Sequence, residues 1–257
     1  MDSAGAAREL LAMRADHRIE PDLPKSLRPA TLAEAYGIQA QVVAGLELAD
    51  AIGYKCACTS PIAQEALAID RPLFGRLLAG TTSPGGSTLD ADRFVHRVIE
   101  AEVGFRLGED VEPVDGGHTA ETIAQCIEVA IPAIEVVDYR YESWTVGALQ
   151  VAADNAIHGW WVAGEPVAGW QHLDLASMAV TVKRNGAAET TGSGANVLGH
   201  PLNVMAWLAD ELPGFGMQLK AGDFVTTGVT TGVFEADAGD EIIAQFAGLG
   251  SVSVSFT

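Results

Sequence analysis

The chain has 257 residues, of which 48% are hydrophobic and 19% are charged, which is typical of a soluble globular protein. Its 34 Asp and Glu against 15 Lys and Arg give a formal net charge of −19, which argues against a nucleic-acid partner. No apolar run approaches the ~18 residues of a membrane span, and the N-terminus lacks an apolar signal-peptide core. Its three cysteines, sparse and odd in number, fit a reducing compartment. We therefore expect a cytoplasmic protein with no membrane partner.

The first third of the chain predicts mostly helix. Apolar spacing and proline borders place three helices, over residues 6–15, from 32 to about Ala49, and 62–68. The second begins with a capping box, in which Thr31 is the N-cap and Glu34 the third helical residue. Residues 53–60 predict a strand and turn. The Gly- and Ser-rich residues 80–87 predict an exposed loop.

Beyond residue 90 the pattern is mostly typical of β-strands. We expect strands at 97–105, 131–140, 178–183, 187–191, 223–227, 232–235, 241–246 and 251–256, and helices at 120–130 and 199–212. Asn185 and Gly186 predict a hairpin turn, because both tolerate positive φ. The sequence thus predicts an α+β protein, with a helical N-terminal part at residues 1–70 and a β-rich body at residues 71–257, as one large domain overall.

Three carboxylates distinguish the two strands on either side of residues 106–130. Glu100 and Glu102 are two residues apart in a predicted strand. Their side chains therefore point from the same face, where the two negative charges repel each other. Glu135 interrupts an apolar run, where an ionised carboxylate is costly unless it is paired or bound to metal. Together they form a candidate oxygen-rich site for Mg²⁺ or Mn²⁺. The alternative is that Glu100 and Glu102 form the solvated face of an amphipathic strand.

Two further motifs are better explained by structural roles than by ligand binding. The glycines of residues 192–199 have the wrong spacing for a dinucleotide site and lack a surrounding βαβ repeat, so we expect a tight turn. Cys56 and Cys58 could bind a soft metal, but no second Cys/His pair completes a site. We expect both to be small buried residues in a strand.

A series of short motifs spans nearly the whole chain in a characteristic order. They lie at residues 35–39, 53–55 with 59–60, 100–105, 132–138, 153–156, 199–209, 219–223 with 227–228, and 248–252. In these motifs the chain resembles the hydratase and decarboxylase branch of the fumarylacetoacetate hydrolase superfamily. That branch contains 2-keto-4-pentenoate hydratase and 4-oxalocrotonate decarboxylase.

The resemblance implies a mixed β-sandwich or β-roll catalytic body with a helical N-terminal cap. It also implies that Glu100, Glu102 and Glu135 bind Mg²⁺ or Mn²⁺. In this branch the ion chelates the carboxylate and 2-oxo oxygens of a small anionic 2-oxo acid and acts as a Lewis acid. Members commonly form homo-oligomers, so a homo-oligomer is expected here.

The resemblance also implies roles for other residues. Lys55 matches the family's active-site lysine, and we assign it to charge stabilisation or to proton transfer, which would need a lowered pKa. Ser60 and Thr227 are candidates to donate hydrogen bonds to the substrate, with turn capping as the alternative. Arg140 and Lys183 are weaker candidates for binding the substrate's carboxylate. Arg140 could instead pair with the nearby Asp138.

One position departs from the family pattern. The hydratases usually have Pro-Asp-(Phe/Tyr)-Gly after the lysine, whereas this chain has Leu73 in place of the acid. Leu73 resembles the decarboxylases and predicts a less polar substrate tail, while Gln64 resembles the hydratases. Asp70 or a bound water could replace the missing acid.

Three functions remain open at this point. The first is a metal-dependent lyase of aromatic or related ring catabolism, with hydration of a 2-hydroxydienoate ahead of 4-oxalocrotonate-type decarboxylation. The second is an acylpyruvate C–C hydrolase, although the His-x-x-Glu of those enzymes is missing near Lys55. The third is a non-catalytic relative, against which the intact glutamates and Lys55 argue.

Overall fold

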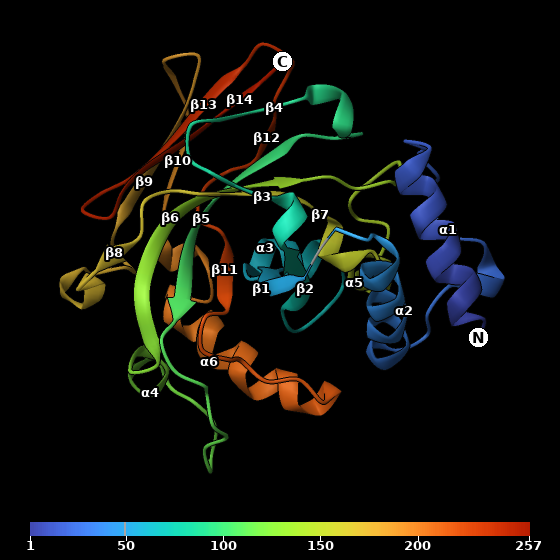
Figure 1. Ribbon diagram of the computed structural model, residues 1–257, viewed down its shortest axis with the longest axis horizontal. Helices are drawn as coiled ribbons and strands as arrows, with labels where there is room; N and C mark the ends of the chain where they lie inside the picture. Colours follow the sequence, from blue (N-terminus) through green and yellow to red (C-terminus); the bar gives the residue numbers. More distant parts are fainter. Residues whose placement is uncertain (49) are drawn as a thin grey trace.

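The computed structural model describes residues 1–48 and 50–257 (Figure 1). The helices of this part are α1 (Ser3–Ala15), α2 (Leu32–Gly45), α3 (Pro61–Ala66), α4 (Ala120–Ala124), α5 (Ala148–Ala153) and α6 (Pro201–Glu211). The strands are β1 (Ala51–Ala57), β2 (Leu73–Leu78), β3 (Thr82–Pro84), β4 (Ser87–Leu89), β5 (Val98–Leu107), β6 (Ile127–Val137), β7 (His158–Ala163), β8 (Val167–Ala168), β9 (Ala179–Arg184), β10 (Ala187–Ser193), β11 (Phe224–Val229), β12 (Phe234–Glu235), β13 (Glu241–Phe246) and β14 (Gly250–Phe256).

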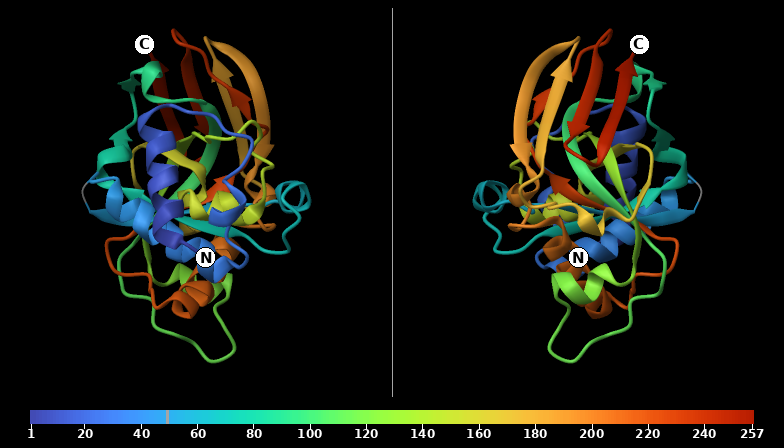
Figure 2. Two further views of the ribbon diagram at one scale, coloured as in Figure 1. Left: turned by 90° about the vertical axis from the view of Figure 1, so that its right-hand side faces the viewer. Right: turned by 90° about the vertical axis from the view of Figure 1, so that its left-hand side faces the viewer.

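The strands form two sheets. The larger has nine strands in the order β2-β1-β11-β5-β6-β7-β3, with β12 beside β5 and β8 beside β6. The smaller has five strands in the order β10-β9-β13-β14-β4, and its β13 and β14 pack against β6. Figure 2 shows the hairpins of the smaller sheet standing above the rest of the molecule, with α1 and α2 on one side. This arrangement confirms the predicted α+β class, with a curled, mixed β body and helices at the N-terminus.

β6 is buried on both faces, and this explains its long apolar run. Ile134 and Val136 belong to the main core, which includes the residues of β13 and β14. Ile131 and Ala133 point the other way and pack with Trp161 inside the curled sheet. Since side chains alternate along a strand, Glu135 shares this inner face. A carboxylate therefore points to the same side of β6 as these apolar side chains.

The N-terminal helices pack against each other, and α2 also contacts α5. Thr31 caps α2 as predicted, by accepting a hydrogen bond from Glu34 N. The Glu34 carboxylate reaches Ala30 N, one residue before the cap. The helix ends at Gly45, and Ala49, where the sequence predicted its end, lies outside the described residues.

Several predicted elements are wrong, because partners distant in sequence decide them. Residues 80–87 are not simply a loop, since β3 pairs with β7 and β4 pairs with β14, which links the two sheets. The helix predicted over 120–130 ends at Ala124, because β6 already begins at Ile127. The division at residue 70 stays a prediction, although β1, which precedes it, lies within the larger sheet. β2, β7 and α5 were not predicted.

No helix within residues 1–48 and 50–257 combines the length and the apolar character needed to cross a membrane.

A left-handed turn lies between α5 and β7. Asn155, Ala156 and Ile157 have φ values of 52°, 51° and 55°, a conformation that costs energy in residues other than glycine. Asn155 holds the turn against β2, because its side chain accepts from Arg76 N and donates to Arg76 O at 2.7 and 3.0 Å. A Cβ on Gly75 would stand 2.5 Å from the Asn155 carbonyl oxygen. The turn therefore requires glycine at this point of β2.

We predict that Gly75→Ala lowers the free energy of unfolding by about 1–3 kcal/mol, since the added methyl forces the turn away from β2. The measurement is denaturant unfolding of the metal-free protein, followed by circular dichroism. Gly37→Ala is the matched control. It lies inside α2 with no heavy atom within 4 Å of the added carbon, and should stabilise by about 0.5–1 kcal/mol. Equal effects of the two substitutions would contradict this account of the turn.

Candidate metal centre

Strand pairing brings the three predicted carboxylates together. Glu100 of β5 and Glu135 of β6 are direct partners in the antiparallel ladder, and Glu102 lies two residues further along β5 on the same face. One oxygen atom from each lies within 4.8 Å of the others. Glu135 thus forms one cluster with Glu102 and Glu100, which precede it by 33 and 35 residues, on the inner face of the curled sheet.

The cluster is buried and short of hydrogen-bond donors. Glu102 and Glu135 are fully buried, whereas Glu100 is partly exposed. Within the described residues, neither carboxylate oxygen of Glu102 has a hydrogen-bond partner, and Oε2 of Glu135 has none either. Buried carboxylate oxygens without partners are costly. They are also hard oxygen ligands of the kind that Mg²⁺, Mn²⁺ and Ca²⁺ bind, so these residues fit a divalent cation.

Lys55 extends from β1 into the same cluster. Its Nζ lies 3.3 Å from Glu135 Oε1 and donates to the Ala156 carbonyl at 2.9 Å. Burial disfavours the charged amine, but the carboxylates of Glu135, Glu100 and Glu102 outweigh this, and the pKa of Lys55 is raised. The sequence predicted that proton transfer would need a lowered pKa. In the metal-free protein the shift has the opposite direction, because three carboxylates surround a single amine.

The carboxylates themselves differ in pKa. Burial, together with Glu135, raises the pKa of Glu100 to about 7. Burial also raises the pKa of Glu102 well above its ordinary value, and the neighbouring Glu135 and Glu100 add to the shift. For Glu135 burial acts in the same direction, but Lys55 and His158 outweigh it, and its pKa is lowered. With all three ionised and Lys55 protonated, the formal charge is −3 + 1 = −2, which one divalent cation balances.

His158 is a member of the site that the sequence analysis missed. Its Nδ1 lies 2.8 Å from Glu135 Oε1, and its Nε2 lies 3.2 Å from Thr81 Oγ1. Burial lowers the pKa of His158, so the ring is neutral and orients the Glu135 carboxylate. Its neighbours in sequence carry no metal-site spacing, and only the pairing of β7 with β6 brings it to the cluster.

A cavity opens beside the cluster. It encloses about 470 Å³, partly open to solvent, and Lys55 and Glu100 lie on its wall. Ser60 lies on the same wall and caps α3, its Oγ accepting from Ala63 N at 3.3 Å. The Ser60 hydroxyl hydrogen can therefore still point to a ligand. The structure thus brings Lys55, Ser60 and the three glutamates to one place.

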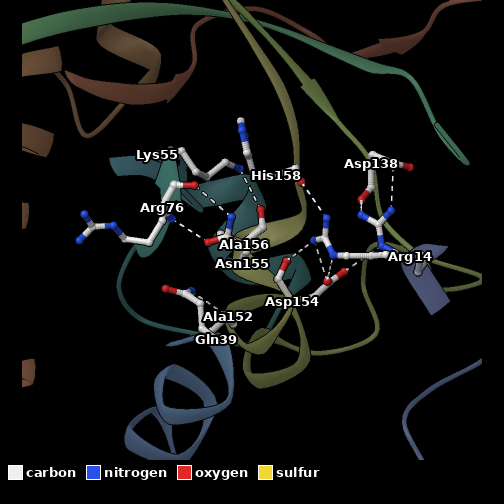
Figure 3. Close-up of polar contacts among 11 residues, drawn as sticks. Arg14, Gln39, Lys55, Arg76, Asp138, Ala152, Asp154, Asn155, Ala156 and His158 are labelled. Atoms are coloured by element: carbon white, nitrogen blue, oxygen red, sulfur yellow. Dashed lines mark hydrogen bonds and ion pairs between the residues drawn. The ribbon is translucent and has the colours of Figure 1, made fainter. Parts of the chain in front are cut away.

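The left-handed turn that contacts Lys55 is held by the N-terminal helices (Figure 3). Arg14 of α1 donates to the Asp154 carboxylate at 2.8 Å and to its carbonyl at 3.0 Å. Gln39 of α2 donates to the carbonyls of Phe74 and Ala152 at 2.9 and 2.7 Å. Through these bonds the helical part fixes the carbonyl of Ala156, and with it the position of the Lys55 amine.

Arg140 belongs to this support and not to the cavity wall. It is buried and donates to the carboxylates of Asp138 at 2.7 Å and Asp154 at 3.4 Å. Two ion pairs in a dry interior leave the guanidinium little capacity for a further anion. The structure therefore favours the alternative that Arg140 pairs with Asp138.

Three other predicted contacts also lie away from the cavity walls. Lys183 is on β9 of the smaller sheet, paired with β13 and β10. Thr227 is buried, and its hydroxyl donates to Val103 O at 2.8 Å. Its neighbour Thr226 is the strand partner of Lys55, and the Thr226 hydroxyl is buried without a hydrogen-bond partner in the described chain. Leu73 is fully buried opposite Ala57, which does line the cavity.

Comparison with known proteins agrees with this architecture. The family model "Fumarylacetoacetate (FAA) hydrolase C-terminal" matches residues 71–257. The chain belongs to the fumarylacetoacetate hydrolase family. Curated relatives place it in the hydratase and decarboxylase branch. It is 34% identical to 2-keto-4-pentenoate hydratase 1 of Dechloromonas aromatica, covering 100% of this chain and 97% of the relative. It is 33% identical to 4-oxalocrotonate decarboxylase of Pseudomonas putida, covering 93% and 89%.

Among solved structures the chain is similar to 4-oxalocrotonate decarboxylase from Pseudomonas putida G7. The complex of that family member with magnesium and adipate superposes with a TM-score of 0.92 at 28% identity, covering 99% of this chain and 97% of the other. A second structure of the same enzyme contains calcium and acetate and superposes with a TM-score of 0.91. That enzyme therefore holds a divalent cation together with a small carboxylate in both structures.

We predict that Glu102→Gln has opposite effects on the metal-free and the metal-bound protein. A raised folded-state pKa means that Glu102 stabilises the fold below the unfolded carboxyl pKa of ~4.3, and that this contribution is lost as the pH rises. Gln does not titrate, so without metal the variant should gain about 1–3 kcal/mol over the parent near neutral pH. The difference should shrink toward pH 4.5. Mn²⁺ affinity should instead fall by at least about tenfold.

Denaturant unfolding in EDTA between pH 4.5 and 8, and Mn²⁺ titration calorimetry, measure the two effects. Glu128→Gln on the same strand β6 is the control, because that carboxylate is 52% exposed and pairs with Arg106 at the surface. It should change the unfolding free energy by less than about 0.5 kcal/mol. If the metal-free Glu102→Gln protein is less stable than the parent at pH 8, the conclusion that the Glu102 carboxylate lacks a hydrogen-bond partner is wrong.

Proposed function

We propose that the protein is a divalent-metal-dependent lyase that hydrates a 2-hydroxydienoate to a 4-hydroxy-2-oxo acid. The observation that carries this is the cluster of Glu100, Glu102 and Glu135 beside Lys55, buried at the end of a cavity. Glu100, Glu102 and Glu135 would hold Mg²⁺ or Mn²⁺. When bound, the ion would supply a Lewis acid for the carboxylate and 2-oxygen of a small anionic 2-oxo acid.

The protein's own groups would orient and polarise the substrate. In the metal-free protein the carboxylates of Glu135, Glu100 and Glu102 raise the pKa of Lys55, which favours a protonated amine. As an ammonium it would stabilise the negative charge that develops on the substrate. Ser60 would donate its hydroxyl hydrogen to a substrate oxygen. In the overall reaction the dienol tautomerises to the 3-enone, and water then adds its hydroxyl at C4 and its proton at C3.

The outer part of the cavity favours hydration over the decarboxylase alternative. A 4-oxalocrotonate-type substrate carries a second carboxylate, which needs a cation or several donors at its far end. Among the described residues, the outer part has hydrogen-bonding side chains at Ser60, Glu100, Tyr139, Trp144 and Thr231, but none of them is basic, so no cation faces a second carboxylate. Decarboxylation keeps one supporting observation, the apolar Leu73, which resembles the decarboxylases.

The remaining predictions concern the surroundings of the enzyme. We retain a homo-oligomer in the cytoplasm as a prediction from the family resemblance and the composition. The acylpyruvate hydrolase has no observation in its favour, and the non-catalytic relative has only Leu73, which stands where the hydratases have an acid. An intact, charged cluster on a cavity wall instead supports catalysis.

We predict that 2-hydroxypenta-2,4-dienoate loses its ultraviolet absorbance with the protein and Mg²⁺, giving 4-hydroxy-2-oxopentanoate, and that EDTA stops the reaction. Lys55→Met should lower kcat by about 10²–10⁴-fold, since a positioned cation is lost. Lys220→Met is the control, because this lysine is 52% exposed and pairs with Asp110 at the surface.

The competing substrate is 2-oxohex-3-enedioate. If CO₂ is released from it while 2-hydroxypenta-2,4-dienoate stays unchanged, the protein is a decarboxylase and the proposed hydration is wrong. Turnover of either compound that is insensitive to EDTA would refute the metal requirement.

A further inference from the structure

The cavity continues outward into a second chamber with a different lining. This outer chamber encloses about 800 Å³, partly open to solvent, and shares with the inner cavity Ser60, Ala63, Glu100, Val137, Trp144, Ile157 and Val229. Its further walls are mostly apolar, formed by Ile62, Val98, Tyr139 and Val233. A molecule bound at the glutamates by one end would therefore extend into apolar surroundings.

The mouth of the outer chamber carries apolar side chains that solvent reaches. Ile62 is 80% exposed, Val233 is 54% exposed and Trp144 is 38% exposed. They come from α3, from the segment before β12 and from the loop before α5, so three separate parts of the chain contribute to one rim. Among the described residues, only three further large apolar side chains are as exposed as these. Apolar side chains that gather at one site indicate a binding surface.

One wall of the outer chamber is held in place before anything binds. The Tyr139 ring stacks on His96, with centroids 3.9 Å apart and planes 12° from parallel. His96 Nδ1 lies 3.1 Å from the Glu235 carboxylate, and its main-chain N–H donates to Asp138 at 2.9 Å. A fixed aromatic wall loses little freedom on binding, which increases affinity for an apolar group.

We propose that the outer chamber binds an uncharged hydrocarbon tail of several carbons on the substrate, at the end away from the carboxylate. This inference rests on the proposed function, since the glutamates and Lys55 hold the polar end. The substrate class is then a 2-hydroxydienoate with an alkyl or aryl substituent larger than methyl. Ile62, Tyr139 and Val233 determine the preference for it.

Two series of compounds test the tail. The first is turnover with Mg²⁺ of 2-hydroxypenta-2,4-dienoate and its homologues lengthened by one to four methylenes. The second is calorimetric binding of saturated 2-oxo acids, from 2-oxobutanoate to 2-oxooctanoate, which needs no turnover. We expect kcat/KM and affinity to rise by roughly two- to fourfold for each methylene that leaves water. The dicarboxylate 2-oxoadipate should bind at least tenfold more weakly than 2-oxohexanoate.

Val233→Lys places a cation at the rim and should reduce the preference for long tails over the shortest compound by at least fivefold. The same variant should strengthen binding of 2-oxoadipate relative to 2-oxohexanoate. Val114→Lys is the matched control, because Val114 is 45% exposed on a loop that does not line the chamber. It should leave both ratios unchanged.

The outcomes separate the tail from the reaction. Binding that strengthens with tail length but no turnover of any dienoate supports the tail and overturns hydration. Turnover with a flat length series overturns the tail and leaves hydration standing. No binding of any 2-oxo acid with Mg²⁺ overturns both. A flat series in which Val233→Lys changes the oligomeric state in sedimentation assigns the rim to subunit contact, and this also overturns the proposal.

Discussion

The burial of three carboxylates inside the curled sheet is the constraint on which the rest of the structure depends. Removing an ion from water costs several kcal/mol even after the protein relaxes, and with all three glutamates ionised and Lys55 protonated the cluster would carry a formal charge of −2. Lys55 and His158 stabilise Glu135, but Glu102 has no hydrogen-bond partner in the described chain. Full ionisation of the cluster is therefore unfavourable until a divalent cation neutralises it, and binding energy and folding energy are coupled at this point.

This constraint explains why the strands that carry the cluster are so well covered. β6 is packed by the smaller sheet on one face and by Ile131, Ala133 and Trp161 around the inner face. This packing leaves the cavity as the side on which solvent reaches the cluster, so the electrostatic interactions of the buried Glu102 and Glu135 remain strong. The cavity then changes from charged walls at Glu100 and Lys55 to apolar walls at its mouth. That change gives a substrate with one charged end a single favourable orientation.

The site residues that could be predicted from the sequence are those whose negative charge is unfavourable beside their neighbours in the sequence. Glu135 stands out because apolar residues surround it, and alternation along a strand places Glu100 and Glu102 on one face. Arg140 could not be assigned in the same way, because its partner Asp154 lies 14 residues away, across a loop and α5. The position of Thr226 beside Lys55 could not be predicted for a similar reason, and a substrate contact at Thr227 stays a prediction. Which face of β11 meets Lys55 depends on its register with β1, and a local pattern does not contain that register. His158 escaped notice because β7 itself was not predicted.

The same limitation applies to the left-handed turn, and here it has a mechanistic consequence. Three successive non-glycine residues with positive φ are unfavourable on their own, and no local motif specifies them. They persist because Asn155 binds β2, Arg14 binds Asp154 and Gln39 binds Ala152. The bonds from Arg14 and Gln39 come from the N-terminal helices. The left-handed turn that they hold places the Ala156 carbonyl where it accepts a hydrogen bond from Lys55. The helices thus contribute to the site without supplying a residue that lines it, because they maintain the strained turn that orients the Lys55 amine.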